Sequence, residues 1–97
     1  MATEKEKAIV QEILGLAMDV NEFGSADAHI EYSGDGLHMY IVPMPYSAKN
    51  EWLYYAKDHA YFSEKVFKES EFIRVADEYI AELKKYHPAF DADGVKL

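Results

Sequence analysis

Residues 28–42 read AHIEYSGDGLHMYIV and predict a β-hairpin against which the rest of the chain packs. The turn is expected at Asp35-Gly36, because these residue types tolerate the positive φ angles that a two-residue hairpin turn requires. A turn one residue earlier, at Gly34-Asp35, is the alternative, and it keeps the same side chains together. Because an isolated hairpin is marginal in water, other elements must cover its apolar side.

The two faces of this hairpin differ in character. Strand alternation places apolar side chains on one face: Ile30, Tyr32, Leu37, Met39 and Ile41. The opposite face carries His29, Glu31, Ser33, His38, Tyr40 and Val42. In one register, His38 lies directly across from Glu31. The apolar face is therefore expected to form the core, and the other face is free for solvent or a partner.

The N-terminal segment predicts an amphipathic helix. Thr3 and Glu6 have the spacing of a capping box, and Gly24 can take the left-handed conformation that ends a helix. An apolar stripe runs between them, made of Ile9, Ile13, Leu16 and Val20, with Val10, Leu14 and Ala17 beside it. Gly15 lies inside this helix, and we interpret it as a point of close approach to a neighbouring element.

The C-terminal half predicts one or two further helices. Residues 46–87 contain neither glycine nor proline, which favours helix, although the aromatic residues at 51–56 would also suit a third strand. The last helix is expected to begin at Ser63 or Ser70 and to end before Pro88. Its apolar stripe comprises Phe72, Ile73, Ala76, Tyr79, Ile80 and Leu83. The expected class is a single α+β domain over residues 1–97, with the helices packed on one face of the sheet.

Length and composition narrow the possible functions. The 97 residues suffice for one core, and an apolar fraction of 49% favours a folded chain. Because there is no cysteine, disulfides and thiolate metal sites are excluded, as suits a reducing compartment. The N-terminus lacks a signal peptide's apolar core, and no apolar run approaches the roughly 20 residues of a membrane span, so a cytoplasmic location is expected. The formal charge of −8 disfavours direct binding to nucleic acid or anionic membranes.

No motif points to catalysis or to a cofactor. The four histidines do not show the spacings of common metal sites, so a His–Glu hydrogen bond on a solvated face is the expected arrangement, without a metal. The serines occupy turn or cap contexts and not a nucleophile elbow. Glutamates are plentiful, and the sequence does not show which of them converge. We therefore predict that the protein is not an enzyme and needs no cofactor.

Aromatic crowding is the most informative functional signal. Six aromatic residues fall within a short stretch: Tyr46, Trp52, Tyr54, Tyr55, Tyr61 and Phe62. A domain of this size has difficulty burying all of them, and tyrosine and tryptophan are enriched at protein interfaces. The predicted partner-binding residues are Tyr40, Trp52, Tyr54, Tyr55, Tyr61, Glu31 and His38.

Three hypotheses of function follow. The first is a small acidic protein-binding module, whose partner is another protein or a second copy in a homodimer. The second is an acidic DNA mimic that inhibits a nucleic-acid-binding protein, and the third is a small enzyme that uses carboxylate or histidine chemistry. In size, charge and helix–hairpin–helix order, the chain resembles small accessory proteins of bacteria and phages, some of which bind a host protein and imitate the charge of DNA. That resemblance implies a protein partner.

Overall fold

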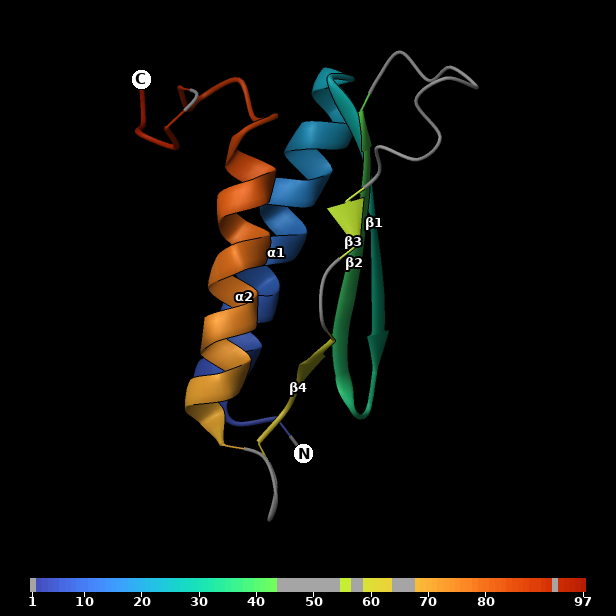
Figure 1. Ribbon diagram of the computed structural model, residues 1–97, viewed down its shortest axis with the longest axis vertical. Helices are drawn as coiled ribbons and strands as arrows, with labels where there is room; N and C mark the ends of the chain where they lie inside the picture. Colours follow the sequence, from blue (N-terminus) through green and yellow to red (C-terminus); the bar gives the residue numbers. More distant parts are fainter. Residues whose placement is uncertain (1, 44–54, 57–58, 64–67, 92) are drawn as a thin grey trace.

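The chain forms two layers, with two helices packed on one face of an antiparallel sheet (Figure 1). The computed structural model describes residues 2–43, 55–56, 59–63, 68–91 and 93–97. Its elements are, in order, α1 (Glu4–Phe23), β1 (Ala26–Ser33), β2 (Gly36–Pro43), β3 (Tyr55–Ala56), β4 (Ala60–Tyr61) and α2 (Glu69–Lys84). The predicted α+β architecture is confirmed. Neither helix within these ranges is long and apolar enough to cross a membrane.

Both ends of α1 follow from local sequence, as predicted. The Glu6 amide donates to the Thr3 hydroxyl at 3.1 Å, and the Thr3 amide donates to the Glu6 carboxylate at 2.8 Å. At the other end, Gly24 adopts a left-handed φ of 87° and its amide donates to the Val20 carbonyl. The buried side of the helix carries Val10, Ile13, Ala17 and Val20. The two ends of α1 and its buried side thus follow from residues within its own segment.

Gly15 does not mark a close approach, so that interpretation is wrong. The residue is exposed on α1, and none of the described atoms lies within 4 Å of the position that a Cβ would occupy. Its presence reflects no packing constraint in the described part of the chain.

Replacing Gly15 with alanine is therefore expected to stabilise the protein. Alanine loses less backbone entropy in a helix, so the free energy of unfolding should rise by up to about 1 kcal/mol. Urea denaturation followed by circular dichroism measures this change. Gly24→Ala serves as the contrasting variant, since the φ of 87° at Gly24 strains any L side chain and should lower stability. Destabilisation by Gly15→Ala would show that the site is in fact crowded.

The hairpin turns one residue earlier than the first expectation. Ser33 pairs with Gly36 and Ile30 pairs with Met39, so the turn residues are Gly34 and Asp35, the alternative register. Gly36 belongs to β2 and has a φ of 152°, which L side chains rarely adopt. The carbonyl oxygen of Ala60 lies only 2.0 Å from the position that a Cβ on Gly36 would occupy. Glycine is thus required at position 36 both by its own φ angle and by the strand β4 that passes beside it.

Two short strands extend the sheet beyond β2. Tyr55 of β3 pairs with Ile41 of β2, and Ala60 of β4 pairs with Leu37 of β2. The lack of glycine and proline favoured a helix in this segment, and that prediction is wrong at residues 55–56 and 60–61. The third strand is confirmed at residues 55–56, whereas residues 51–54 lie outside the described ranges.

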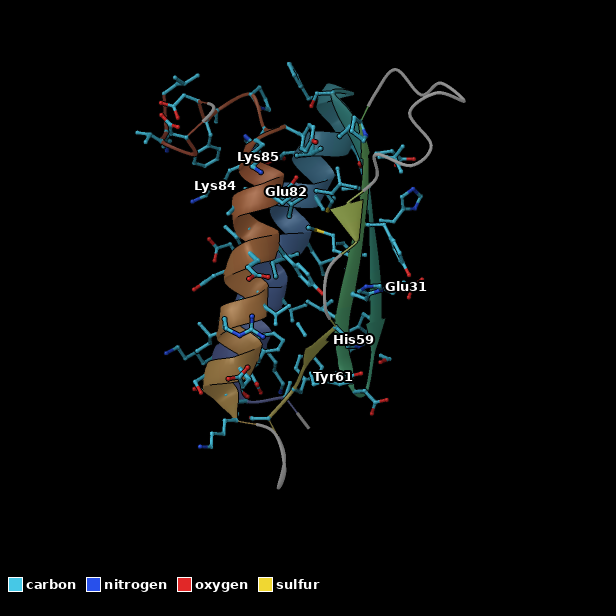
Figure 2. All side chains as sticks on the ribbon, viewed as in Figure 1. Glu31, His59, Tyr61, Glu82, Lys84 and Lys85 are labelled. Atoms are coloured by element: carbon cyan, nitrogen blue, oxygen red, sulfur yellow. The ribbon has the colours of Figure 1, made fainter. Side chains whose placement is uncertain are left out.

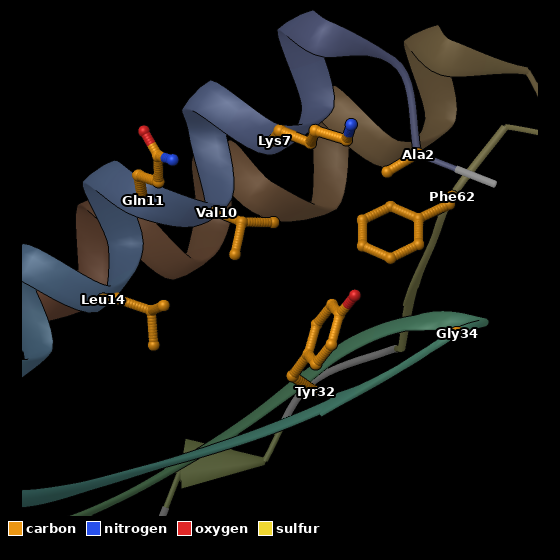
Figure 3. A pocket seen from close by; sticks show the side chains of 8 residues that line it. All are labelled: Ala2, Lys7, Val10, Gln11, Leu14, Tyr32, Gly34 and Phe62. Carbon is orange, nitrogen blue, oxygen red and sulfur yellow. The ribbon is translucent and has the colours of Figure 1, made fainter.

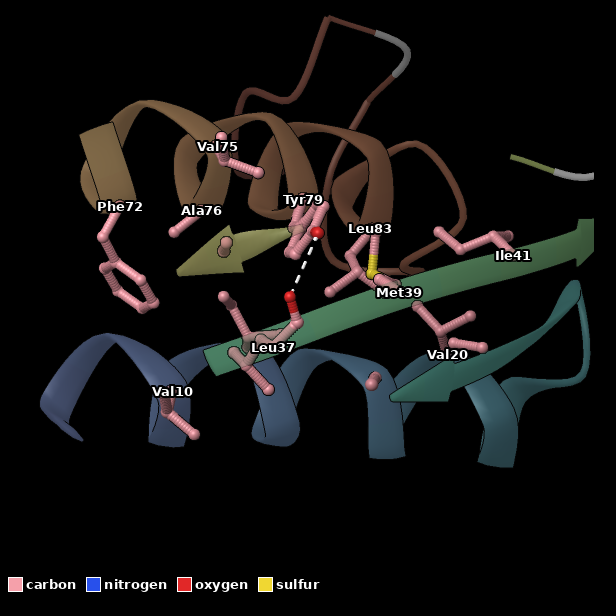
Figure 4. Close-up of a cluster of buried hydrophobic side chains, with 14 of the residues drawn as sticks. Val10, Val20, Leu37, Met39, Ile41, Phe72, Val75, Ala76, Tyr79 and Leu83 are labelled. Carbon is pink, nitrogen blue, oxygen red and sulfur yellow. Dashed lines mark hydrogen bonds between the residues drawn. The ribbon is translucent and has the colours of Figure 1, made fainter. Parts of the chain in front are cut away.

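The core lies between the sheet and the helices (Figure 4). Leu37, Met39 and Ile41 of β2 are fully buried beneath the apolar side of α2, whose buried residues are Phe72, Val75, Ala76, Tyr79 and Leu83. The Tyr79 hydroxyl donates to the Leu37 carbonyl at 3.4 Å, which satisfies a polar group inside this core.

The start of α2 differs from the prediction. The helix begins at Glu69 after Lys68, which makes no side-chain cap, so neither Ser63 nor Ser70 caps it. Ser70 lies in the first turn of the helix, and the Ser63 amide and hydroxyl are used in a contact with α1. Tertiary contacts therefore override the local capping signals here.

Candidate functional site: the outer face of the sheet

Both helices lie on the same side of the sheet, and the candidate site is the opposite side (Figures 1 and 2). We call this side the outer face. Strand β1 contributes exposed side chains to it, and β2 contributes half-buried ones: Asp27, His29, Glu31 and Ser33 from β1, and His38, Tyr40 and Val42 from β2. Since none of these residues is needed to pack the helices, the outer face can vary its chemistry without loss of the fold.

Four rings form a continuous row on the outer face, and we call them the ring row. Tyr40 and His38 of β2 lie edge to face, with ring centroids 4.5 Å apart. His38 stacks on His59 at 5.6 Å, and His59 stacks on Tyr61 at 4.5 Å. The row crosses from β2 to β4 because Gly36 pairs with Tyr61, which brings His59 beside His38. Ring contacts of this kind restrict the rotation of the side chains that make them.

The centre of the ring row contains an unsatisfied polar atom. The Nε2 atom of His59 is inaccessible to solvent and has no hydrogen-bond partner among the described residues. A covered polar nitrogen without a partner costs about 1–3 kcal/mol relative to a bonded one.

Carboxylates flank the imidazoles on this face. Glu31 pairs directly with His38 across the β1–β2 ladder, as one of the predicted registers required. His29 contacts Asp27 at 3.0 Å in an exposed pair. Among the residues that the structure describes, no group of three or more histidines and carboxylates is placed to hold a metal ion. The outer face therefore combines aromatic area with hydrogen-bonding groups.

The predicted partner-binding residues have different outcomes. His38, Tyr40 and Tyr61 come together in the ring row, and Glu31 lies on the adjacent strand. Tyr61 keeps 43% of its surface exposed.

The other three predicted residues are not placed in this site. The backbone of Tyr55 pairs with Ile41, and its side chain lies outside the description. Trp52 and Tyr54 fall in the part of the chain that is not described.

His59 is the residue that the sequence analysis missed. A helix over this segment, favoured by the sequence, hides the strand alternation in which His59 and Tyr61 share one face while Ala60 and Phe62 share the other. Ala60 and Phe62 are buried, whereas Tyr61 is exposed, as the period of two in a strand requires. That alternation over residues 59–62 is the signal that could have placed His59 on the outer face.

A buried carboxylate anchors the segment that carries half of the ring row. Glu6 of α1 is fully buried and accepts hydrogen bonds from the Ser63 amide at 2.9 Å and the Ser63 hydroxyl at 3.1 Å. The same carboxylate accepts from the Thr3 amide, so it ties the start of α1 to the residues just after β4. The position of Tyr61 on the outer face thus depends on a contact made on the inner side.

The hydrogen bonds to Glu6 determine its charge state. Burial alone would raise the pKa of the Glu6 carboxyl, but the amides of Thr3 and Ser63 and the Ser63 hydroxyl together outweigh it and lower the pKa below 4.5. The carboxylate is therefore ionised at neutral pH, in the form that can accept all of these bonds.

Comparisons with known proteins found no matching family model, no matching curated protein and no matching solved structure.

Proposed function

We propose that this protein is a non-enzymatic binding module that holds a protein partner against the outer face of its sheet. The ring row carries the proposal, because it places four aromatic rings in mutual contact on the side that the helices leave uncovered. Rings fixed in this way lose little conformational entropy on binding, which is why tyrosine is favoured at interfaces.

The charge of the chain favours a particular kind of partner surface. With a net charge of −8, and with Asp27 and Glu31 exposed beside the rings, the protein attracts neutral or basic surfaces and repels acidic ones. The rings supply the buried centre of such an interface, and the carboxylates supply its rim. Binding carried mainly by the rings distinguishes this proposal from DNA mimicry, in which the carboxylates make the main contacts.

Tyr61→Ala is expected to weaken partner binding at least tenfold while the domain stays folded, because the side chain is 43% exposed and makes a ring contact at the end of the row. Proteins captured from the native host by the immobilised wild type are compared with those captured by the immobilised variant. For each protein that the wild type captures specifically, the affinity for both forms is then measured. Sedimentation of the wild type at several concentrations tests whether the partner is a second copy.

Two further variants make this test specific. Tyr61→Phe keeps the ring and should retain most of the affinity, whereas Phe23→Ala removes a side chain that is 60% exposed at the end of α1 and should have no effect. Affinity that falls steeply with salt but not with Tyr61→Ala would support DNA mimicry instead. Equal capture by the wild type and by Tyr61→Ala would contradict the proposal.

A further inference from the structure

A groove runs between α1 and the free edge of β1. The sheet order places β1 at the margin, paired only with β2 among the described strands. Leu14 and Met18, one turn apart on α1, have exposed fractions of 39% and 62%, and Tyr32 of β1 has 68%. Apolar side chains thus border the groove on both sides, although the core does not use them.

The edge of β1 is capped at one end and open at the other. The Asn21 side chain accepts from the Ala28 amide at 2.6 Å and donates to the Ala28 carbonyl at 3.0 Å, so it occupies the place of a neighbouring strand. In an antiparallel ladder alternate residues point the same way, so the backbone groups of Ile30 and Tyr32 also face outward. Within the described chain, no residue bonds to these outward groups of Ile30 and Tyr32. The open part of the edge is therefore ready to pair with another strand.

A pocket lies beside this open part. It has a volume of about 480 Å³ and is lined by Ala2, Lys7, Val10, Gln11, Leu14, Tyr32, Gly34 and Phe62. Figure 3 shows the rings of Tyr32 and Phe62 on one side and the side chains of α1 on the other. This volume is enough for one or two apolar side chains.

The geometry joins the edge and the pocket into a single site. The contact of Asn21 with Ala28 and the joint lining by Leu14 and Tyr32 show that α1 and β1 run side by side in opposite directions. A strand added along Ile30 and Tyr32 would direct every second side chain to the helix side, where the pocket opens. Its intervening side chains would lie on the outer side of the sheet, next to Glu31, because Asp27 lies beyond the capped position at Ala28.

We infer that this groove binds an extended peptide segment of a partner, in which apolar residues alternate with basic ones. Backbone pairing with Ile30 and Tyr32 supplies affinity, the pocket selects the apolar side chain, and the carboxylate of Glu31 selects the basic one. A second copy is the less suitable occupant, since its β1 strand carries the same carboxylate and each chain has a charge of −8. This site does not use the rings, which lie on β2 and β4, and it shares only Glu31 with the interface proposed above.

The probes are eight-residue fluorescent peptides with lysine at every second position and one of leucine, isoleucine, valine, phenylalanine or tyrosine at the others. At least one should bind the full chain with a Kd below about 1 mM, and Leu14→Glu should weaken it tenfold or more, because a charge would enter the mouth of the pocket. Val95→Glu alters a side chain that is 60% exposed, in the C-terminal segment, and should leave binding unchanged. The same peptide methylated on alternate backbone nitrogens should not bind.

Amide hydrogen exchange gives the sharper readout. Peptide binding should protect the amides of Ile30 and Tyr32 from exchange, while those of Glu31 and Ser33, already bonded to β2, should change little. Protection without this alternation, or failure of all the peptides to bind, would overturn the inference. So would self-association of the wild type that Leu14→Glu abolishes, because the occupant would then be a second copy.

Discussion

Gly36→Ala is expected to destabilise the protein by about 3 kcal/mol or more and to detach β4 from the sheet. A Cβ at this position would lie 2.0 Å from the Ala60 carbonyl oxygen and 2.9 Å from its carbonyl carbon. Both are backbone atoms, so no side-chain rotation can relieve the clash. The φ of 152° adds strain for any L residue, and the Phe62 amide, which donates to the Asp35 carbonyl at 2.9 Å, would lose its partner.

Thermal unfolding measures this effect, and a loss of 3 kcal/mol should lower the Tm by more than about 10 °C. Gly34→Ala is the matched control in the same hairpin. None of the described atoms lies within 4 Å of a Cβ at Gly34, and its φ is one that L residues adopt, so that variant should be nearly neutral. Similar stabilities for the two variants would show that β4 does not cross at Gly36.

The Gly36 variant also tests how the outer face is assembled. If β4 detaches, His59 and Tyr61 leave the ring row, while His38 and Tyr40 stay on β2. The chemical shifts of the His38 and His59 imidazole protons, which the neighbouring rings displace, should then move toward random-coil values. A partner captured through Tyr61 should be lost in the same variant.

Glu6→Ala is expected to cost about 3 kcal/mol. It removes the acceptor of three donors, which are the Thr3 amide, the Ser63 amide and the Ser63 hydroxyl. Buried donors left without a partner each cost about 1–3 kcal/mol, and part of this cost is recovered where water can reach them. The capping box of α1 is lost in the same substitution.

Chemical denaturation of Glu6→Ala and Glu4→Ala separates the buried carboxylate from an ordinary surface one. Glu4 belongs to the same helical turn but is exposed, and its pair with Lys7 at 3.2 Å should contribute less than about 0.5 kcal/mol. If Glu6→Ala lowers the free energy of unfolding by no more than Glu4→Ala does, the hydrogen bonds between Glu6 and Ser63 contribute nothing to stability.

Glu6 also predicts how stability depends on pH. Its pKa in the folded protein lies below 4.5, so the unfolded chain binds the proton more tightly than the folded one. The stabilisation is therefore fully present well above pH 4.5, and it is lost as the pH falls through the folded-state pKa. Glu6→Gln should be less stable than the wild type at pH 7, and the difference between them should shrink as the pH falls below 4.5.

The hairpin and α1 show how much of the fold is encoded locally. The alternation of residues 28–42 predicted which side chains form the core, and Leu37, Met39 and Ile41 are fully buried. Thr3 and Gly24 predicted both ends of α1, because capping depends on backbone groups a few residues away. These predictions succeeded because the residues that interact lie within the same short segment.

The segment after β2 shows where local reasoning fails. Residues 55–56 and 60–61 pair with β2 because its backbone groups offer hydrogen bonds that a helix would leave unused. That pairing moves His59 next to His38, a contact between residues far apart in the sequence. The ring row could therefore be predicted only in part, through His38, Tyr40 and Tyr61.

The amino-acid sequence alone determined the hairpin faces, the limits of α1 and the apolar side of α2, since these depend on periodicity and on capping over short distances. The tertiary structure decided the position of the turn, the crossing at Gly36, the burial of Glu6 and the open edge of β1. Each of these depends on which groups of other elements lie beside the residues concerned. The pattern of one segment cannot predict which distant groups those will be.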